Sequence, residues 1–214
     1  MAAPDVIHSE KEQKIQQTNK MSIWQLIKED WSYNRKDWRH PGFRALAVYR
    51  FGEWVYALNS KLAQAILRKI YGILFRYVRN HYGIEIARGA KIGRGVVIGH
   101  HIGVVIGSNV EIGDRCLIRH NVTIGAASND QTKLKPKIGN HVQIGAGAQI
   151  VGNVTVGEGT RIGSNAVVTA DVAPNSIVFV EKPKTIQLPE AVRKSRAAIR
   201  QSDREVGAMR KGAD

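Results

Sequence analysis

An aliphatic residue recurs at every sixth position through the second half of the chain, and this period constrains the fold more than any other feature of the sequence. The series comprises Ile86, Ile92, Ile98, Ile106, Ile112, Ile118, Ile124, Ile138, Ile144, Ile150, Val156, Ile162 and Val168. A small residue, usually glycine, follows most of them. An α-helix cannot keep a six-residue pattern on one face, and a flat strand of period two gives no reason for glycine at every sixth residue.

A coil with three short sides per turn explains both observations. Each side takes about six residues, the aliphatic side chain points inward, and glycine fits corners where a side chain would clash or where φ is positive. Stacked coils pair their backbones along the axis, so each coil covers the edge of its neighbour. The period therefore predicts a mainly β chain folded as a parallel β-helix of triangular cross-section. Cys116 falls on a second inward series and is interpreted as a core residue rather than a nucleophile.

The six-residue period breaks at two places. Between Ile98 and Ile106 the step is eight, so two extra residues bulge out at the sequence HHIG. Between Ile124 and Ile138 the step is fourteen, and a loop at 126–137 leaves the coil. A structural repeat has no use for such departures, so we expect function there.

Three histidines are predicted to cluster at the first break. One turn of about eighteen residues plus the bulge places Ile118 over Ile98, and therefore His120 over His100. His100, His101 and His120 are the candidate catalytic group, because imidazoles titrate near neutral pH. The other histidines are interpreted as inert; they are His8, His40, His81 and His141, the last facing solvent.

The first 82 residues follow a helical pattern instead. Ser22 is a candidate N-cap, Pro41–Gly42 breaks the chain, and two amphipathic helices follow. Their apolar stripes, Val48, Phe51, Val55 and Leu58 in one and Ile66, Ile70, Leu74 and Tyr77 in the other, are expected to pack on each other or on another subunit. The predicted organisation is a disordered N-terminus (1–20), an α-helical region (21–82), the β-helix (83–186, with its loop at 126–137) and a basic helical C-terminal tail (187–214).

Lys and Arg exceed Asp and Glu by 32 to 18, a formal net charge of +14, which indicates anionic partners. No basic-aromatic nucleic-acid module is present, so no nucleic-acid partner is expected. The basic helices are interpreted as a solvated surface, with peripheral contact to a membrane as the alternative. A single cysteine fits a reducing compartment. Neither a signal peptide nor an apolar run of about 20 residues is found, which predicts a cytoplasmic protein.

The chain resembles the serine acetyltransferases, within the acyl-CoA acyltransferases built from hexapeptide repeats. The similarity is carried by KIGRGVVIGHHIGVVIG (91–107), by coils that include GAGAQIVG (145–152) and by the helix GFRALAVYRFGEWVY (42–56), and it covers roughly residues 25–186. The resemblance implies a left-handed β-helix, a homotrimer with active sites between subunits, and acetyl-CoA as co-substrate. In that family the helical part can join two trimers. It is shorter here, so a trimer is expected, with a hexamer as the alternative.

The resemblance also implies roles for single residues. His100 matches the family's catalytic histidine, which takes the proton from the acceptor hydroxyl as its oxygen attacks the thioester. Backbone N–H groups exposed by the glycine-rich coils are the expected oxyanion donors. The pantetheine arm is expected to run past Gly145, Ala146, Gly163 and Ser164. Lys182 and Lys184 are expected to meet the CoA phosphates, or else to be solvated charges. No metal is expected.

This sequence departs from the family pattern at three places. The Asp before the family's catalytic histidine is Gly99 here, so His101 or His120 is expected to orient His100 instead. The loop triplet Asp-Arg-His corresponds to Lys133, Leu134 and Lys135; Lys135 is the candidate acceptor-binding group, or else a plain loop lysine. The chain ends in RKGAD, without the isoleucine by which the family docks cysteine synthase, so that complex is not expected.

Several functions stay open at this point. The resemblance favours an O-acetyltransferase acting on L-serine, in cysteine biosynthesis. The departures in the loop keep a sugar O-acetyltransferase of bacterial exopolysaccharide or surface polysaccharide biosynthesis as an alternative. A zinc hydratase like the carbonic anhydrases on left-handed β-helices needs two histidines five apart, whereas His100 and His120 are twenty apart. A catalytically inactive scaffold is the last alternative.

Overall fold

The computed structural model describes residues 22–128, 135–182, 184–187, 189–196, 199 and 201. It divides into two compact units, one ending at Val180 and one beginning at Glu181. The predicted disordered N-terminus (1–20), residues 129–134 of the loop and residues 202–214 of the predicted tail lie outside the described residues.

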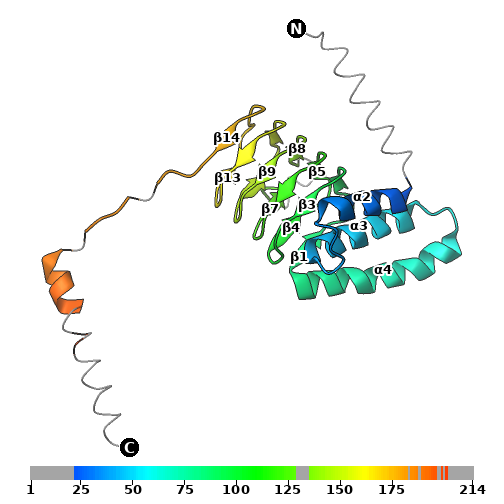
Figure 1. Ribbon diagram of the computed structural model, residues 1–214, viewed down its shortest axis with the longest axis horizontal. Coiled ribbons are helices and arrows are strands. Elements are labelled where there is room, and N and C mark those ends of the chain that lie inside the picture. The colour runs from blue at the N-terminus through cyan, green and yellow to red at the C-terminus, as the bar shows by residue number, and fades with distance from the viewer. Residues whose placement is uncertain are drawn as a thin grey trace, which may run out of the picture. The chain divides into compact units, whose positions relative to one another are not determined.

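Three helices open the first unit: α2 (Ile23–Tyr33), α3 (Pro41–Ala57) and α4 (Lys61–Tyr82) (Figure 1). Ser22 caps α2, as predicted. Pro41 and Gly42, predicted to break the chain between helices, are instead the first residues of α3. Proline suits the first helical position because no hydrogen bond is required of its nitrogen there, and His40 supplies the N-cap. Gly83, in the left-handed conformation, ends α4.

The described part of the chain then forms short strands of two or three residues. They are β1 (Ile84–Ile86), β2 (Lys91–Ile92), β3 (Val97–Ile98), β4 (Val104–Ile106), β5 (Glu111–Ile112), β6 (Leu117–Ile118), β7 (Thr123–Gly125), β8 (Lys137–Ile138), β9 (Gln143–Ile144), β10 (Gln149–Val151), β11 (Thr155–Val156), β12 (Arg161–Ile162), β13 (Val167–Val168) and β14 (Ile177–Val178). A corner follows each strand, as sides of about six residues require.

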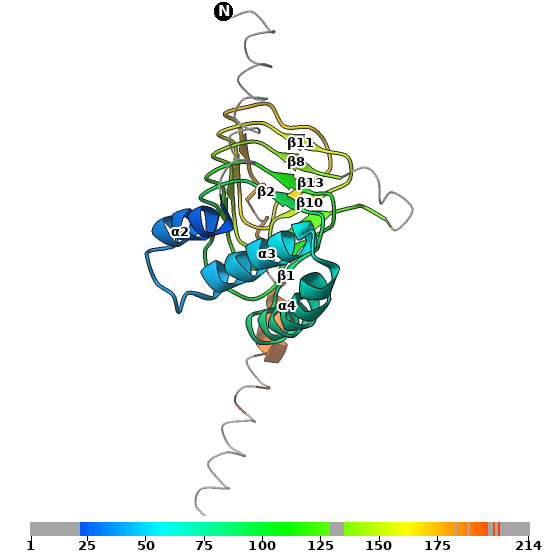
Figure 2. The same ribbon diagram turned by 90° about the vertical axis from the view of Figure 1, so that its right-hand side faces the viewer.

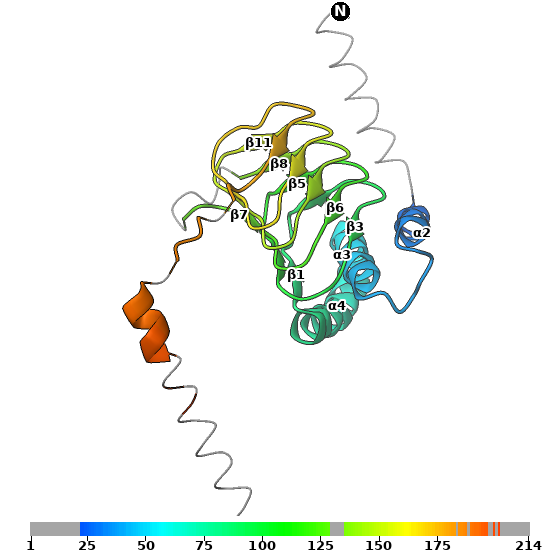
Figure 3. The same ribbon diagram turned by 60° about the vertical axis from the view of Figure 1, so that its left-hand side comes forward.

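The strands stack into three parallel sheets, which the chain visits in turn (Figures 2 and 3). Sheet 1 has the order β1-β4-β7-β10-β13, sheet 2 the order β2-β5-β8-β11, and sheet 3 the order β3-β6-β9-β12-β14. In sheet 3, Ile98 pairs with Ile118, Ile118 with Ile144, and Ile144 with Ile162. The predicted fold, a mainly β parallel β-helix of hexapeptide repeats preceded by a helical region, is confirmed.

The interior of the β-helix consists of the residues that the period predicts. The six-residue series is buried from Ile86 to Val168, and so is the second series, which comprises Val110, Cys116, Val122, Val142, Ala148 and Val154. The Cys116 Sγ donates to the carbonyl oxygen of Gly139 at 3.1 Å. Burial raises the pKa of the Cys116 thiol to about 12, so the thiolate is inaccessible at neutral pH. Cys116 is therefore a core residue.

A buried ion pair fixes α2 and α3 to the first coil. The Arg50 Nε donates to Asp30 Oδ2 at 3.0 Å, and its Nη1 and Nη2 donate to the carbonyl oxygens of Ile92 (2.7 Å) and Gly93 (2.5 Å). The Asp30 Oδ1 accepts from the backbone N–H of Gly95 at 3.2 Å. Two helices and the stretch leading into β3 therefore share one polar core, which we call the Asp30–Arg50 anchor.

The two predicted apolar stripes do not pack on each other within the chain. Helix α3 and helix α4 meet through Gly52, which lies against the ring of Tyr71, and through the edge-to-face pair of Tyr56 and Tyr71. The stripe of α4 that begins at Ile66 is exposed. The expectation that the two stripes pack on each other inside one chain is therefore wrong. Helix α4 carries two apolar faces, and the face that contains Tyr71 contacts α3, whereas the stripe that begins at Ile66 does not.

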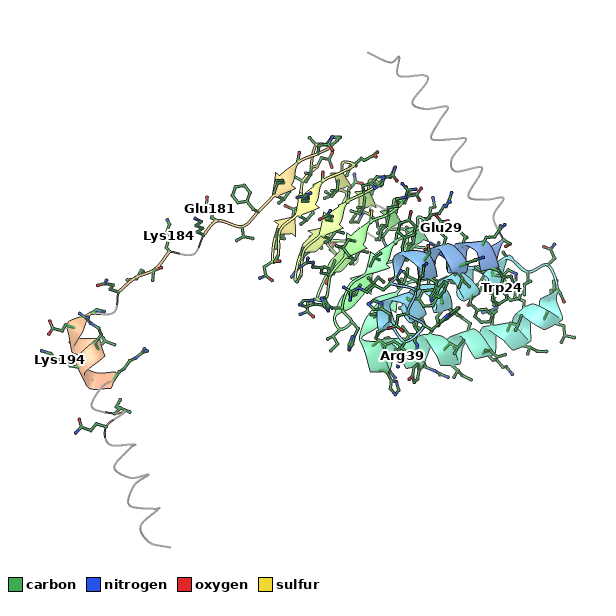
Figure 4. The ribbon with its side chains drawn as sticks, in the orientation of Figure 1. Trp24, Glu29, Arg39, Glu181, Lys184 and Lys194 are labelled. Carbon is green, nitrogen blue, oxygen red and sulfur yellow. The ribbon has the colours of Figure 1, made fainter. Side chains whose placement is uncertain are left out.

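The second unit is described only in part. Residues 190–196 are helical, and Lys194 Nζ lies 3.0 Å from Glu190 Oε1, one helical turn away. Figure 4 labels Glu181, Lys184 and Lys194 on this unit. The predicted basic helical tail over 187–214 stays a prediction, because most of it lies outside the described residues.

Candidate active site

The segment 100–103 departs from the regular coil, as the eight-residue step predicts, and we call it the histidine bulge. His100 has a φ of +65°, Ile102 of +81° and Gly103 of +75°. The left-handed region is uncommon for residues with a side chain and is an outlier for a β-branched residue such as isoleucine. Backbone strain of this kind persists where the surrounding structure enforces it, and it clusters at functional sites. The strain makes the histidine bulge a candidate site.

Backbone contacts from two sides hold the histidine bulge. The carbonyl oxygen of Tyr82, at the end of α4, accepts from the Ile102 N–H at 2.8 Å, and that of Gly83 accepts from the Val104 N–H at 3.1 Å. On the other side, the Ile102 carbonyl accepts from the Asn121 N–H at 3.0 Å. A Cβ on Gly83 would lie 3.1 Å from the Ile102 Cα, so glycine lets α4 end directly against the bulge.

The register brings His100 and His120 together. Ile98 pairs with Ile118, as predicted, and the rings of His100 and His120 lie edge to face, with centroids 5.8 Å apart and an interplanar angle of 82°. The Nδ1 of His120 is buried and has no hydrogen-bond partner in the described part of the chain. Leaving a buried polar atom unpaired costs about 1–3 kcal/mol. His120 therefore has a buried ring nitrogen that the described residues leave without a hydrogen-bond partner, and its ring lies next to the exposed ring of His100.

His101 lies on the other side of the bulge. Its ring is edge to face with that of Tyr82, with centroids 6.4 Å apart. The Tyr82 hydroxyl accepts from Arg44 Nη1 at 2.7 Å, which ties this ring to α3. Of the two residues that the sequence offered as partners of His100, His120 has the geometry for that contact, and His101 packs on Tyr82.

A fourth histidine lies near this group, at a partly buried position that the interpretation of the sequence did not foresee. His40 caps α3, and Gly42 in the first turn packs so closely on the carbonyl of Ile98 that a Cβ would overlap it. This contact places the start of α3 beside the histidine bulge. Burial lowers the pKa of His40, the nearby Arg35 guanidinium lowers it further, and Asp37 opposes this. No local pattern could reveal this, because the contact joins residues about 60 positions apart in the sequence.

The candidate residues on successive coils share one corner. Where the chain passes from sheet 3 to sheet 1, the second residue after each strand is His100, His120, Ala146 or Ser164. We call this the histidine corner. Neighbouring strands lie about 4.8 Å apart, so the column extends over about 14 Å. Two of the predicted catalytic histidines, His100 and His120, therefore lie along one line with the predicted pantetheine residues, which are Gly145, Ala146, Gly163 and Ser164.

Coil stacking requires Gly145 and Gly163 at the histidine corner. A Cβ on Gly145 would lie 2.6 Å from the backbone nitrogen of Ser164. The N–H groups of Gly145 and Gly163 donate to carbonyls of the next coil at 2.8 and 2.7 Å, so they are not free donors. Within the described residues, the N–H groups of Ala146 and Ser164 donate no hydrogen bond. The backbone N–H groups that these glycine-rich coils leave free are therefore those of the residues that follow the glycines, Ala146 and Ser164.

Lys135 lies at a different corner. The loop leaves the coil between β7 and β8, where sheet 1 passes to sheet 2, and we call this the loop corner. The Lys135 Nζ donates to the Ser108 Oγ at 2.8 Å. One side of the triangle separates this corner from the histidine corner, so a single chain does not bring Lys135 and His100 together. Lys133 and Leu134 lie outside the described residues.

The remaining predicted residues lie in the second unit. Lys182 and Lys184 are exposed there, and Lys184 is labelled in Figure 4. Within the described ranges, no group of three His, Cys, Asp or Glu side chains is arranged to hold a metal ion.

Sequence reasoning missed one more residue at the histidine corner. Arg119 is exposed and follows Ile118 directly, so the register places it between Gly99 and Gly145 of the neighbouring coils. It carries a guanidinium group beside His120, which suits a carboxylate or phosphate. The register of the coils could have identified this position, whereas no motif marks it.

Comparison with protein families gives one matching model, described as bacterial transferase hexapeptide (six repeats), over residues 89–126 and 135–170. A curated relative, the serine acetyltransferase of Helicobacter pylori (strain J99 / ATCC 700824), is 41% identical over 169 residues, which span 77% of this chain and 94% of the relative.

Two solved structures are similar in fold as well as in sequence. The serine acetyltransferase of Brucella abortus strain S19 in complex with coenzyme A has a TM-score of 0.62 and 25% identity, over 73% of this chain and 65% of its own. The serine acetyltransferase of Neisseria gonorrhoeae in complex with serine has a TM-score of 0.61 and 26% identity, over 76% of this chain and 68% of its own. The match covers about two thirds of the length of these two proteins.

Proposed function

Because the chain belongs to the serine acetyltransferase family of hexapeptide-repeat acyltransferases, we propose that it transfers the acetyl group of acetyl-CoA to the hydroxyl group of L-serine. One observation carries the proposal: the exposed imidazole of His100 lies on a strained bulge, at the same corner as the free N–H groups of Ala146 and Ser164. The complexes of similar proteins with coenzyme A and with serine support these two ligands. The names of the relatives favour serine over the sugar acceptor.

His100 is the proposed general base. Its neutral ring takes the proton of the serine hydroxyl while the serine oxygen forms a bond to the thioester carbonyl carbon. The tetrahedral intermediate then breaks its C–S bond, and the imidazolium of His100 returns the proton to the departing thiolate. The products are an O-acetylated serine and free CoA, and no proton or electron is left over.

His120 is the proposed positioning residue for His100. The family has an aspartate immediately before its catalytic histidine, and this chain has Gly99 there, so another group must fix the ring. The edge-to-face contact and the unpaired Nδ1 of His120 support this assignment over His101. We expect His120→Phe, which keeps a ring but removes both nitrogens, to change the pH profile of kcat/KM. A purely structural role predicts lower activity with an unchanged profile.

The pantetheine arm of acetyl-CoA is proposed to lie along the histidine corner. Its amide oxygens are acceptors, and the N–H groups of Ala146 and Ser164 offer donors about 4.8 Å apart, one per coil. That Lys182 and Lys184 meet the phosphates stays a prediction from the resemblance; both side chains are exposed. Phosphates bind such groups through charge-assisted hydrogen bonds.

We propose that the chain assembles as a homotrimer, with a hexamer as the alternative. A measurement of the mass of the assembly in solution distinguishes the two. Lys135 and His100 lie at different corners of one chain, so a site that uses both requires a neighbouring chain. Refolding His100→Ala with Lys135→Ala in equal amounts tests this, because about one quarter of such shared sites would combine an intact His100 with an intact Lys135. No recovery of activity above the separate variants would contradict the shared site.

The decisive experiment is free-thiol release from acetyl-CoA with L-serine as the acceptor. We expect His100→Ala to lower kcat/KM by about 10²–10⁴-fold, the usual contribution of a general base. The matched control is His141→Ala, since His141 is also an exposed histidine with positive φ, at the third corner of the coil. An active His100→Ala enzyme would refute the proposed base. Faster transfer to a nucleotide sugar than to L-serine would show that the acceptor is a sugar and not serine. A cytoplasmic location stays a prediction from the sequence alone.

A further inference from the structure

Helix α4 presents an apolar stripe on the side away from α3, and we call it the outer face of α4. Its residues follow spacings of three and four, which place them on one side of a helix. Their exposed fractions are Leu62 75%, Ile66 56%, Ile70 44%, Ile73 59%, Leu74 38% and Tyr77 46%. The stripe runs along about 22 Å of helix. Figure 4 shows side chains standing off the free side of α4, at the edge of the first unit.

The outer face is not needed to attach α4 to the rest of the first unit. Other positions of the helix do this: Val78 is buried, and Tyr71 packs on Gly52. A monomeric protein rarely exposes a contiguous apolar stripe of this size without a partner.

The charge of α4 indicates what the partner is. The helix contains Lys61, Arg68, Lys69, Arg76 and Arg79 and no acidic residue. Lys69 and Arg76 are exposed and flank the outer face. We propose that the outer face of α4 docks on the surface of an anionic lipid bilayer, with its aliphatic side chains in the headgroup boundary and its basic side chains at the phosphates. An amphipathic basic helix lies in that interface.

The helix would lie on the bilayer rather than cross it. None of the helices in the described residues combines the length and the apolar composition that crossing a membrane requires. The five cations of α4 agree with this, since they are favourable at phosphates and costly in hydrocarbon.

A twofold contact with a second copy of the chain fits the outer face less well. A twofold contact pairs a surface with itself, so Lys69 and Arg76 of one α4 would approach the same cations of the other. The helix has no carboxylate to separate them. Anionic lipid supplies the missing negative charge, whereas a second α4 adds positive charge.

Vesicle co-sedimentation of the full chain tests the proposal. The probes are vesicles of phosphatidylcholine alone and vesicles with about one third phosphatidylglycerol. We expect binding to the anionic vesicles that weakens with salt, and at least tenfold weaker binding for Ile66→Ser/Ile73→Ser. The matched control is Val167→Ser/Ile177→Ser, which changes two equally exposed aliphatic residues on the β-helix (60% and 67%). Lys69→Glu/Arg76→Glu should weaken anionic binding by about fivefold per charge removed.

Tyr77 is left unchanged because its ring contacts that of Tyr82, whose carbonyl supports the histidine bulge. Failure of the wild-type chain to sediment with anionic vesicles would overturn the proposal. Equal binding to both kinds of vesicle would overturn its charge component. If Ile66→Ser/Ile73→Ser dissociates an oligomer in analytical ultracentrifugation, a second copy covers the face and the proposal fails.

Acetyl transfer to serine without lipid should be unchanged in every α4 variant. The proposed acetyl transfer and the docking can therefore fail separately.

Discussion

The Asp30–Arg50 anchor gives the sharpest test of how the helices hold the candidate site. Both side chains are almost fully buried, with exposed fractions of 1% and 7%. Replacing Asp30 by alanine removes the charge that faces Arg50 Nε and the acceptor of the Gly95 N–H, while Arg50 keeps its contacts to two carbonyls. Removing one partner of a buried ion pair costs about 3–5 kcal/mol.

Two further variants accompany Asp30→Ala: Asp30→Asn, which keeps part of the hydrogen bonding, and a matched control at the neighbouring residue. Burial raises the pKa of the Asp30 carboxyl, and the adjacent Arg50 opposes this. Asp30→Asn keeps one acceptor oxygen for the Gly95 N–H but loses the charge and the second acceptor, which faces Arg50 Nε. Because one of the two hydrogen bonds survives, we expect a smaller cost of about 1–3 kcal/mol. The matched control is Glu29→Ala, one residue earlier, which is labelled in Figure 4. Glu29 forms a bidentate pair with Arg94 that is partly exposed, and such pairs contribute about 1 kcal/mol or less.

Equilibrium urea unfolding at one protein concentration measures these differences. All four tryptophans, Trp24, Trp31, Trp38 and Trp54, lie in or between α2 and α3, so their fluorescence reports the helices. Circular dichroism follows the strands as well. A loss below about 1 kcal/mol for Asp30→Ala, or a loss equal to that of Glu29→Ala, would show that the anchor does not hold the helices.

Three shorter predictions concern the core, the helix cap and the corner. Cys116 should not react with Ellman's reagent at pH 8 in the folded protein, because burial raises the pKa of its thiol to about 12. It should react fully in urea. Rapid reaction without denaturant would show that the thiol lies at the surface. The folded pKa of His40 is lowered from 6.5, so its contribution to stability is present above pH 6.5 and is lost as the pH falls through the folded pKa. His40→Asn, which keeps an N-cap, should flatten that pH dependence of urea unfolding; an unchanged slope contradicts the assignment. Gly145→Ala should destabilise the protein by about 1–3 kcal/mol in thermal unfolding, because the added Cβ would lie 2.6 Å from the Ser164 nitrogen. An unaltered melting temperature would count against close stacking of the coils.

The β-helix was predictable because every coil repeats the same physical requirement. An inward aliphatic residue and a small corner residue recur on each side, so the period fixes sheet, register and core together. Ile98 lies over Ile118, and His120 beside His100, for this reason alone. The same register places Arg119 at the histidine corner. A search of each corner for exposed residues, and not only for histidines, would have identified it.

The packing of the helices was not predictable from the same kind of pattern. Helix α4 has two apolar faces, and periodicity alone does not say which of them meets α3. The stripe that begins at Ile66 was expected to pack on the stripe of α3 or on another subunit. It is exposed in the single chain, and Tyr71 makes the contact with α3 instead. His40 was likewise missed, because its position depends on how closely Gly42 of α3 approaches Ile98.

The strain in the histidine bulge links these two parts of the molecule. A regular coil cannot hold Ile102 at a φ of +81° by itself, since that conformation disfavours a β-branched residue. The backbone contacts that hold it come from Tyr82 at the end of α4 and from Asn121 in the next coil. The orientation of His100 therefore depends on the helical region as much as on the repeat that carries it. A β-helix cut free of its helices would keep its core and lose one of the two supports that place the imidazole. The helical region thus belongs to the candidate site and is not an accessory to it.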